Sequence, residues 1–185
     1  MFVAGDLLWY PVKRNNKVRV APDAMVVFGR PKGYRGSYRQ WVEDGVTPQV
    51  VFEVLSPSNR AGEMARKALW YDRYGVEEYY IYDPDRKDFA ALVRSVVTGH
   101  LEEVPLPVSG YVSPRLGVRF DLSTDDLVIY RPDGEPFQTY GEVFAARDAA
   151  LAERDAETVR ADAAQAAAAR LAAKLRALGV DPDAA

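Results

Sequence analysis

Two apolar runs that each contain one carboxylate place the strongest constraint on how this chain can fold. In the run "PDAMVVFG" (22–29), Asp23 precedes the apolar residues, and in "QVVFEVLS" (49–56), Glu53 lies inside them. Short runs rich in valine and other apolar residues predict strands buried in a sheet. An ionised carboxylate in such surroundings is unfavourable unless it is paired or bound to a cation. The two acids therefore indicate a chemical site as well as a fold.

The segment 1–140 predicts a mixed α/β (α+β) fold with many strands and few helices. A helix is expected at about 60–74, capped by Ser58 or Asn59 and ended by Gly75 in the left-handed conformation. The segment 77–96 predicts a hairpin, with its turn at Asp83-Pro84-Asp85. Further strands are expected at 3–12, 17–20, 24–29, 49–56, 101–106, 117–122 and 127–138.

From about residue 140 the composition changes to alanine and charged residues without proline. This pattern predicts one long helix over 141–179 that ends at Gly179, followed by a disordered tail over 180–185. The apolar face is mostly alanine, and no strict heptad runs along its whole length. A weak coiled coil or an oligomerising helix is one interpretation, and a solvated helix that packs only at its ends is the other.

The composition excludes several kinds of site. The chain has 185 residues, no cysteine and a single histidine, His100. These counts exclude disulfides, cysteine nucleophiles and a two-histidine metal site, and the lack of cysteine fits a reducing cytoplasm. The first residues lack a signal-peptide pattern, and no run reaches the roughly 18 apolar residues of a membrane span. We therefore expect a cytoplasmic protein whose chemistry depends on carboxylates, lysine and tyrosine.

Residues 30–48 are expected to form a long loop in which cations alternate with aromatic residues. The net charge of −3 argues against nucleic-acid binding through bulk charge, but it permits a local basic groove. Such a loop can bind phosphates and stack bases. The plainer interpretation is a solvated loop whose aromatic residues lie on the core. The residues concerned are Arg30, Lys32, Arg35 and Arg39, with Tyr34, Tyr38 and Trp41 between them.

Asp23 and Glu53 lie on predicted strands that could pair and share one divalent cation. Oxygen ligands of this kind suit Mg²⁺ or Mn²⁺, and the Val54 carbonyl could add a further ligand. Lys67, on the following predicted helix, could orient the attacking water and stabilise developing negative charge. Each residue also has a plainer interpretation: a turn at Pro-Asp for Asp23, an outward-facing acid for Glu53, and a solvated helix lysine for Lys67.

The order of three segments resembles a known family. "PDAMVVFG", "VVFEVLSPSNR" and "RKALWYDRYGVEEYYIYDPD" together are similar to the Uma-type restriction endonuclease family of the PD-(D/E)XK nuclease superfamily, over roughly residues 3–140. The resemblance implies a restriction-endonuclease-like core, in which a mixed sheet flanked by helices binds Mg²⁺ at one edge. It implies that Asp23 and Glu53 are the two motif acids.

The motif lysine is displaced in this sequence. Its usual position falls on Leu55, and Lys67 on the following helix matches the lysine that this family uses instead. Ser56 and Tyr71 match other recurrent positions, where structural and catalytic roles are both open.

Family members usually begin with a helix that brings a further acid to the metal. This sequence begins directly with a predicted strand, so we expect that helix to be absent and the chain to be a truncated or degenerate copy. Asp6 could supply the further carboxylate, or it could be a turn residue.

Three functional hypotheses follow from these observations. The first is a Mg²⁺-dependent endonuclease that hydrolyses DNA phosphodiester bonds through Asp23, Glu53 and Lys67. The second is a catalytically inactive nuclease fold that serves as a DNA-binding or oligomerising module. The third is a hydrolase of small phosphoesters, which would use the same acids without the basic loop. We expect DNA as the partner and a homodimer that forms through the C-terminal helix.

Overall fold

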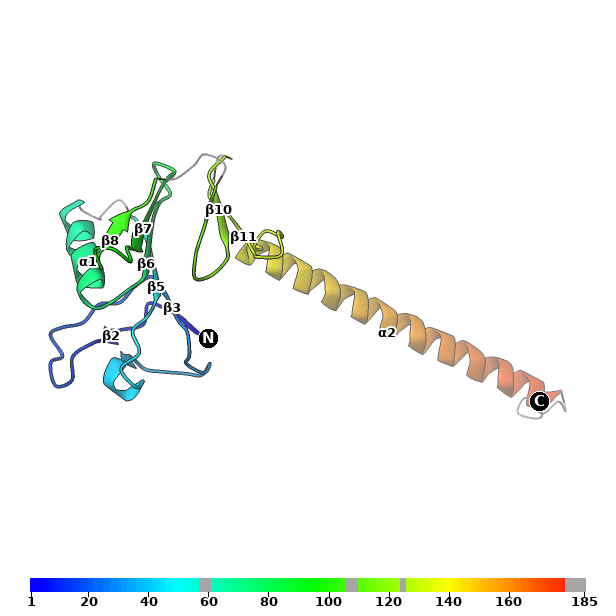
Figure 1. The fold of residues 1–185 in the computed structure, drawn as a ribbon. Helices are drawn as coiled ribbons and strands as arrows, with labels where there is room; N and C mark the ends of the chain where they lie inside the picture. The colour runs from blue at the N-terminus through cyan, green and yellow to red at the C-terminus, as the bar shows by residue number, and fades with distance from the viewer. Residues whose placement is uncertain (57–60, 106–109, 124–125, 179–185) are drawn as a thin grey trace. The chain divides into compact units, whose positions relative to one another are not determined.

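The computed structural model describes residues 1–56, 61–105, 110–123 and 126–178 (Figure 1). The chain divides into two compact units, Met1–Phe137 and Gln138–Ala185. The first unit contains the described strands and a helix of 13 residues, α1 (Ala61–Arg73). The second contains a helix of 38 residues, α2 (Tyr140–Ala177). The mixed α/β core with few helices is as predicted.

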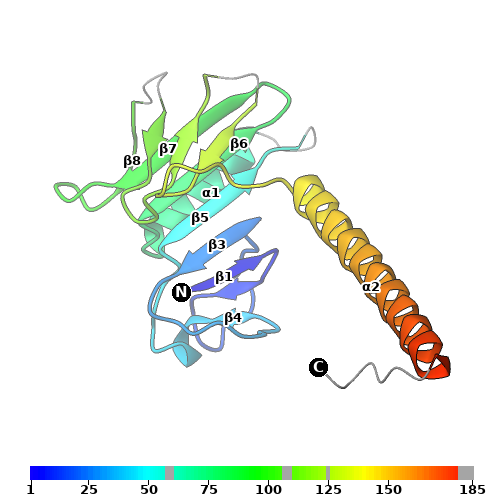
Figure 2. The same ribbon diagram turned by 90° about the vertical axis from the view of Figure 1, so that its right-hand side faces the viewer.

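A mixed sheet of six strands forms the centre of the first unit, in the order β1-β3-β5-β6-β7-β8. Only β5 and β6 pair in parallel, and the other neighbouring strands are antiparallel. Helix α1 connects this parallel pair and lies against the sheet (Figures 1 and 2). The six strands are β1 (Phe2–Gly5), β3 (Ala24–Val27), β5 (Val50–Val54), β6 (Glu78–Asp83), β7 (Asp88–Arg94) and β8 (Leu101–Glu103).

Two smaller sheets complete the first unit. A parallel pair joins β2 (Trp9–Tyr10) to β4 (Tyr38–Arg39). A three-stranded antiparallel sheet has the order β11-β10-β9. Its strands are β9 (Tyr111–Val112), β10 (Arg119–Asp121) and β11 (Val128–Tyr130).

Alternation of side chains along the strands divides the core into two clusters, one on each face of the large sheet. On β5, Val51 packs with residues of α1, β2 and β4, whereas Val50 and Phe52 pack with Phe120 of the three-stranded sheet. Glu53 shares the face of Val51, because the two residues are two positions apart. The buried acid therefore lies on the side of the sheet that α1 covers.

The predicted helix and hairpin agree with the structure. The turn after α1 contains Gly75 at a φ of 86°, as the left-handed prediction requires. Strands β6 and β7 form the hairpin, in which Asp83 Oδ1 accepts hydrogen bonds from the backbone N–H groups of Asp85 and Arg86, each 3.0 Å long. The predicted caps Ser58 and Asn59 lie outside the described residues.

Several local predictions were wrong. The segment 3–12 is two strands, because the backbone turns at Asp6, whose φ is 51°. The segment 17–20 is no strand, and Val20 contributes only an isolated bridge to Trp9. The loop 30–48 contains β4 and a 3₁₀ helix, Gln40–Val42, and β9 was not predicted.

A second buried acid, Glu78, joins the large sheet to the segment that follows β9. Its Oε2 accepts hydrogen bonds from the hydroxyls of Tyr80, at 2.8 Å, and Ser113, at 2.5 Å. Its Oε1 accepts one from the backbone N–H of Arg115, at 2.7 Å. Three donors satisfy this buried carboxylate, which indicates a structural role.

Helix α2 begins with a capping box. The Thr139 hydroxyl accepts a 3.2 Å bond from the Glu142 N–H, and the Glu142 carboxylate accepts a 2.7 Å bond from the Thr139 N–H. No residue of α2 is buried. The helix ends at Ala177, and the predicted end at Gly179 and tail at 180–185 lie outside the described residues. In the described part of the chain, no helix has an apolar stretch that could cross a bilayer.

Candidate active site

Asp23 immediately precedes β3 and is tied to β5. Ala24 is opposite Phe52 in the antiparallel ladder, so the same register carried one residue further places Asp23 opposite Glu53. Asp23 Oδ2 accepts a 2.6 Å hydrogen bond from the backbone N–H of Val54. The two acids expected from the sequence to be neighbours are therefore neighbours across one strand pair.

Glu53 is a buried carboxylate with a donor on each oxygen. Only 2% of its surface is exposed. Its Oε2 accepts a 2.8 Å bond from Lys67 Nζ, which also forms a salt bridge, and its Oε1 accepts a 2.5 Å bond from the Tyr71 hydroxyl. Lys67 and Tyr71 lie one turn apart on α1, so one face of the helix presents both donors to the acid.

Burial is the main influence on the titration of this cluster. It raises the pKa of Glu53, the hydrogen bonds from Lys67 and Tyr71 lower that pKa in part, and the charge of Asp23 raises it. Burial and the neighbouring Glu53 also raise the pKa of Tyr71 well above its ordinary value. The Tyr71 hydroxyl therefore keeps its proton and acts as a donor to Glu53.

Aromatic rings surround the buried end of the site. The Tyr71 ring lies 4.9 Å from the ring of Tyr79 and 6.4 Å from that of Trp9, measured between centroids. Both neighbours are fully buried. These rings exclude water from one side of Glu53, which explains why burial dominates its pKa.

The other site residues expected from the sequence lie around this cluster. Val54 has an exposed side chain, and its backbone N–H is the group that binds Asp23. Ser56 is exposed beyond the end of β5. Asp6 is exposed, and its N–H donates to the carbonyls of Pro22, at 3.1 Å, and Asp23, at 3.3 Å. Its positive φ favours the turn interpretation.

The donor atoms fit Mg²⁺ in kind. Asp23, Glu53 and the Val54 carbonyl offer oxygen only, which suits a hard cation. Among the described residues, no group of three or more acidic or histidine side chains could hold a metal. Mg²⁺ commonly keeps several waters and uses only one or two carboxylates, so two acids suffice in number. The roles of these residues in metal binding and catalysis stay predictions.

Half of the cations expected to contact nucleic acid are paired with acids of the same loop. Arg30 forms a 2.5 Å ion pair with Asp44, and Arg35 Nε forms one of 2.7 Å with Glu43. Lys32 is exposed. Arg39 is exposed on β4, where it lines a pocket together with Tyr10, Arg14, Asn15, Asn16, Ser37 and Trp41. Four of those residues lie in 10–16, which sequence reasoning did not connect with the basic loop.

The signal for these missed residues is weak in the sequence. Tyr10 follows a buried tryptophan, so alternation along a strand would place its side chain away from the core. The polar run Arg14-Asn15-Asn16 indicates a turn. Nothing local shows that this turn meets β4, because the parallel β2–β4 pairing brings together residues about thirty positions apart.

The chain is similar to one known protein family and to a solved nuclease structure. Residues 2–129 match the model of the Uma2 family, described as "Putative restriction endonuclease". A search of curated proteins gave no match. Among solved structures, the chain is similar to "a putative nuclease belonging to DUF820 from Anabaena variabilis ATCC 29413", with a TM-score of 0.48 and 14% identity, over 66% of this chain and 65% of that one. The chain thus spans just under two thirds of that protein.

The family match covers well over half of the chain and includes the strands and the helix that carry Asp23, Glu53 and Lys67. It confirms the resemblance drawn from the three sequence segments. The chain therefore belongs to the Uma2 family of restriction-endonuclease-like proteins.

Proposed function

We propose that this protein is a Mg²⁺-dependent endonuclease that hydrolyses phosphodiester bonds in DNA. The observation that carries the proposal is the placement of Asp23 opposite Glu53, with Lys67 bonded to Glu53. Membership of a family described as "Putative restriction endonuclease" supports the reaction class and the DNA substrate.

In this proposal Asp23, Glu53 and the Val54 carbonyl hold the cation, which is Mg²⁺ or its substitute Mn²⁺. The bound cation would polarise a phosphoryl oxygen and lower the pKa of a water. The chain itself sets the position of the acids. The bond between Asp23 and the Val54 N–H fixes β3 against β5, and the bond from Tyr71 fixes the Glu53 side chain.

Lys67 assists the attacking water in this proposal. An ammonium group has three N–H donors, and one of them binds Glu53 Oε2 at 2.8 Å. The others can orient a water or bind a phosphate oxygen on which negative charge develops. The Lys67 side chain keeps 21% of its surface exposed, so substrate can reach it.

A second candidate function is an inactive nuclease fold that binds DNA or oligomerises. The observation that favours it is that Lys67 and Tyr71 already occupy both oxygens of Glu53. A lysine that neutralises a buried carboxylate can replace the metal as its partner. In both candidates we propose a homodimer that forms through α2.

Nicking of supercoiled plasmid and cleavage of single-stranded DNA test the two candidates. Wild type, Glu53→Ala and the exposed control Glu103→Ala are compared with Mg²⁺, with Mn²⁺ and without metal. The endonuclease predicts metal-dependent cleavage by wild type and Glu103→Ala alone. Cleavage by none of the folded proteins would support the inactive fold, and equal cleavage by Glu53→Ala would reject the assigned site.

A further inference from the structure

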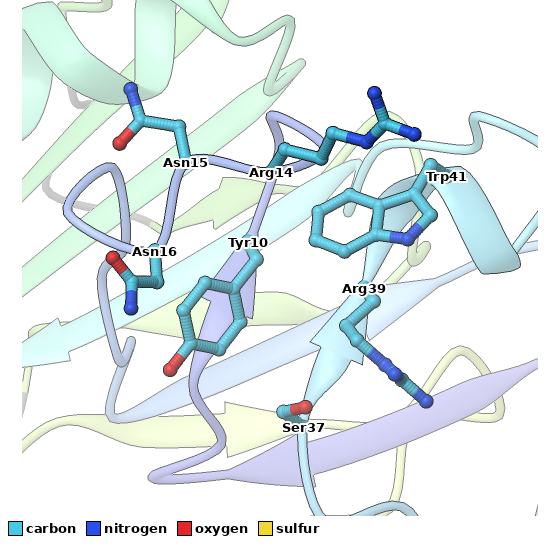
Figure 3. Close-up of a pocket in the computed structure, with 7 residues that line it drawn as sticks. All are labelled: Tyr10, Arg14, Asn15, Asn16, Ser37, Arg39 and Trp41. Atoms are coloured by element: carbon cyan, nitrogen blue, oxygen red, sulfur yellow. The ribbon is translucent and has the colours of Figure 1, made fainter.

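A pocket outside the Asp23–Glu53 site lies on the outer side of the β2–β4 pair. Its volume is about 450 Å³. Its seven lining residues, shown in Figure 3, are Tyr10, Arg14, Asn15, Asn16, Ser37, Arg39 and Trp41. Such a volume lies within the ordinary range of small-molecule sites, roughly 300–1,000 Å³.

The parallel register of β2 and β4 builds the pocket. Trp9 is opposite Tyr38, and both are fully buried in the core cluster beside α1. Tyr10 is opposite Arg39, and alternation turns both of these side chains away from that core. The chain on either side of the pair then supplies the remaining lining residues, from 14–16 and from Ser37 and Trp41.

The lining chemistry is that of a nucleotide site. The guanidinium groups of Arg14 and Arg39 can each bind a phosphate, and none of the seven lining residues is acidic. Tyr10 and Trp41 present aromatic rings, on which a base can stack. In Figure 3 the two arginine side chains extend past the Trp41 indole, one above it and one below it in that view. The Asn16 amide can bond to a base edge, whereas Asn15 Oδ1 already accepts a hydrogen bond from the Lys17 backbone N–H.

The basic loop expected from the sequence is less suited to this role. The loop cations Arg30 and Arg35 are paired with acids, and Tyr38 is buried with its hydroxyl donating to the Val46 carbonyl at 2.7 Å. By contrast, within the described residues Arg14 and Arg39 have no acidic partner. The guanidinium groups that are available to bind a phosphate are therefore those of the pocket.

We infer that this pocket binds one nucleotide unit, with its base against Tyr10 or Trp41 and its phosphate on the Arg39 guanidinium. Resting on the proposed function, the occupant is an unpaired nucleotide of a DNA strand, and a free mononucleotide has the same chemistry. Trp9, adjacent to Tyr10, packs against Tyr71, which donates to Glu53. The pocket and the acid pair are therefore built on one core cluster.

The test measures binding without cleavage. A fluorescein-labelled oligothymidylate of about twelve nucleotides is titrated with full-length protein in EDTA, and its anisotropy is followed at several salt concentrations. Arg39→Ala should weaken binding about tenfold and lower the slope of log affinity against log salt by about 0.7, the value for one phosphate contact on a single strand. Lys13→Ala, which removes an exposed positive charge next to Arg14, is the matched control. It should change the affinity and the salt slope less than Arg39→Ala does.

Stacking is tested at Trp41. Trp41→Ala should weaken binding about tenfold, whereas Trp41→Phe should retain most of the affinity, because a ring remains for the base. An abasic strand of the same length should bind wild type and Trp41→Ala equally. Competition by deoxythymidine monophosphate would identify a free nucleotide as an occupant, and its failure would restrict the pocket to strands.

The inference is overturned if Arg39→Ala and Lys13→Ala weaken binding equally. It is also overturned if Arg39→Ala and Trp41→Ala both bind as wild type does, or if wild type binds neither the oligonucleotide nor the mononucleotide. Circular dichroism checks that each variant is folded. The assay contains no metal, so an inactive nuclease with a working pocket would bind normally here and fail only in the plasmid assay.

Discussion

The Tyr71 hydroxyl donates a 2.5 Å hydrogen bond to Oε1 of Glu53, on the carboxylate edge opposite to the one that Lys67 binds. One face of α1 therefore supplies both hydrogen-bond donors to the buried Glu53 carboxylate of β5. Burial raises the pKa of this acid, and the two donors counteract that rise in part because they favour the charged form. Substitutions at the three positions should have separable effects on metal affinity, turnover and stability.

Glu53→Gln should lower Mg²⁺ affinity by more than about 100-fold. Residues that only support a metal ligand typically change affinity by about 10–100-fold, so removal of a ligand should exceed that range. The fold should be retained or stabilised, because the substitution removes a buried charge that Asp23 repels. Isothermal titration with Mg²⁺ and with Mn²⁺ measures the affinity. Unchanged metal affinity in a folded variant would exclude Glu53 as a ligand.

Lys67→Ala should slow DNA cleavage by roughly 10²–10³-fold while Mg²⁺ affinity stays unchanged. Loss of a group that stabilises developing charge typically has an effect of this size on turnover. Single-turnover cleavage at saturating metal measures the rate, and titration calorimetry measures the affinity. Lys67→Arg serves as the control that keeps the positive charge. A loss of metal binding in Lys67→Ala would contradict the role assigned to this lysine.

Tyr71→Phe should destabilise the protein by about 1–3 kcal/mol at neutral pH, because one oxygen of the buried Glu53 carboxylate loses its donor. Glu53 has a raised pKa, so the folded chain holds its proton more tightly than the unfolded chain. Its contribution to stability is therefore present below the ordinary carboxyl pKa and is lost as pH rises through the raised value.

Loss of the Tyr71 bond raises the pKa of Glu53 further, so the loss of stability with rising pH extends to higher pH. Urea unfolding at several pH values above about 4.5 measures the free energy of unfolding, with Glu53→Gln as the variant that lacks the Glu53 carboxyl. If Tyr71→Phe stops losing stability at the same pH as wild type, the hydroxyl does not influence the pKa of Glu53.

Glu78→Ala should cost about 3 kcal/mol or more in the free energy of unfolding. The substitution leaves the Tyr80 hydroxyl, the Ser113 hydroxyl and the Arg115 N–H without their acceptor. Glu77→Ala is the matched control, since its ion pair with Arg115 is exposed and should contribute no more than about 1 kcal/mol. Chemical denaturation compares the two variants, and equal losses would mean that the buried bonds add no stability.

Deletion of 145–185 should lower the oligomeric state and leave the first unit folded. The first unit has its own core clusters, and no residue of α2 is buried. A long helix that exposes apolar side chains, as this one does at Leu151, Val159 and Leu171, gains stability if it pairs with a second copy. Light scattering coupled to gel filtration measures the mass. If the number of copies per particle is unchanged, so that each copy loses only the mass of the deleted residues, α2 is not the assembly element.

Elements with a strong local pattern were predictable from the sequence. Strands β3 and β5 follow from runs of valine, the β6–β7 hairpin from its Asp-Pro-Asp turn, and the end of α1 from Gly75. The small parallel pair was not predictable, because β4 is only two residues long and its partner is distant in sequence. The same holds for the break at Asp6, where a positive φ is adopted by a residue that is not glycine.

The residues of the candidate site also include some that the sequence predicts and some that it does not. Asp23 and Glu53 could be paired from the sequence because each carboxylate stands out against an apolar run, and Lys67 because of its place on the next helix. Glu78 was missed, since it follows another glutamate and resembles a solvated pair until Ser113 and the Arg115 N–H are seen to bind it. The ion pairs of Arg30 and Arg35 were not foreseen, because their acidic partners come later in the same loop, and the expected contact of these residues with nucleic acid stays a prediction.

The two residues of β2 have opposite surroundings, with Trp9 in the core beside Tyr71 and Tyr10 at the outer pocket. A strand shifted by one residue turns every side chain to the other face. Insertion or deletion of a single residue between Asp6 and Trp9 would thus be far more damaging than any one substitution there. It would carry the tryptophan into solvent and remove the support of Glu53 and the pocket wall in one event.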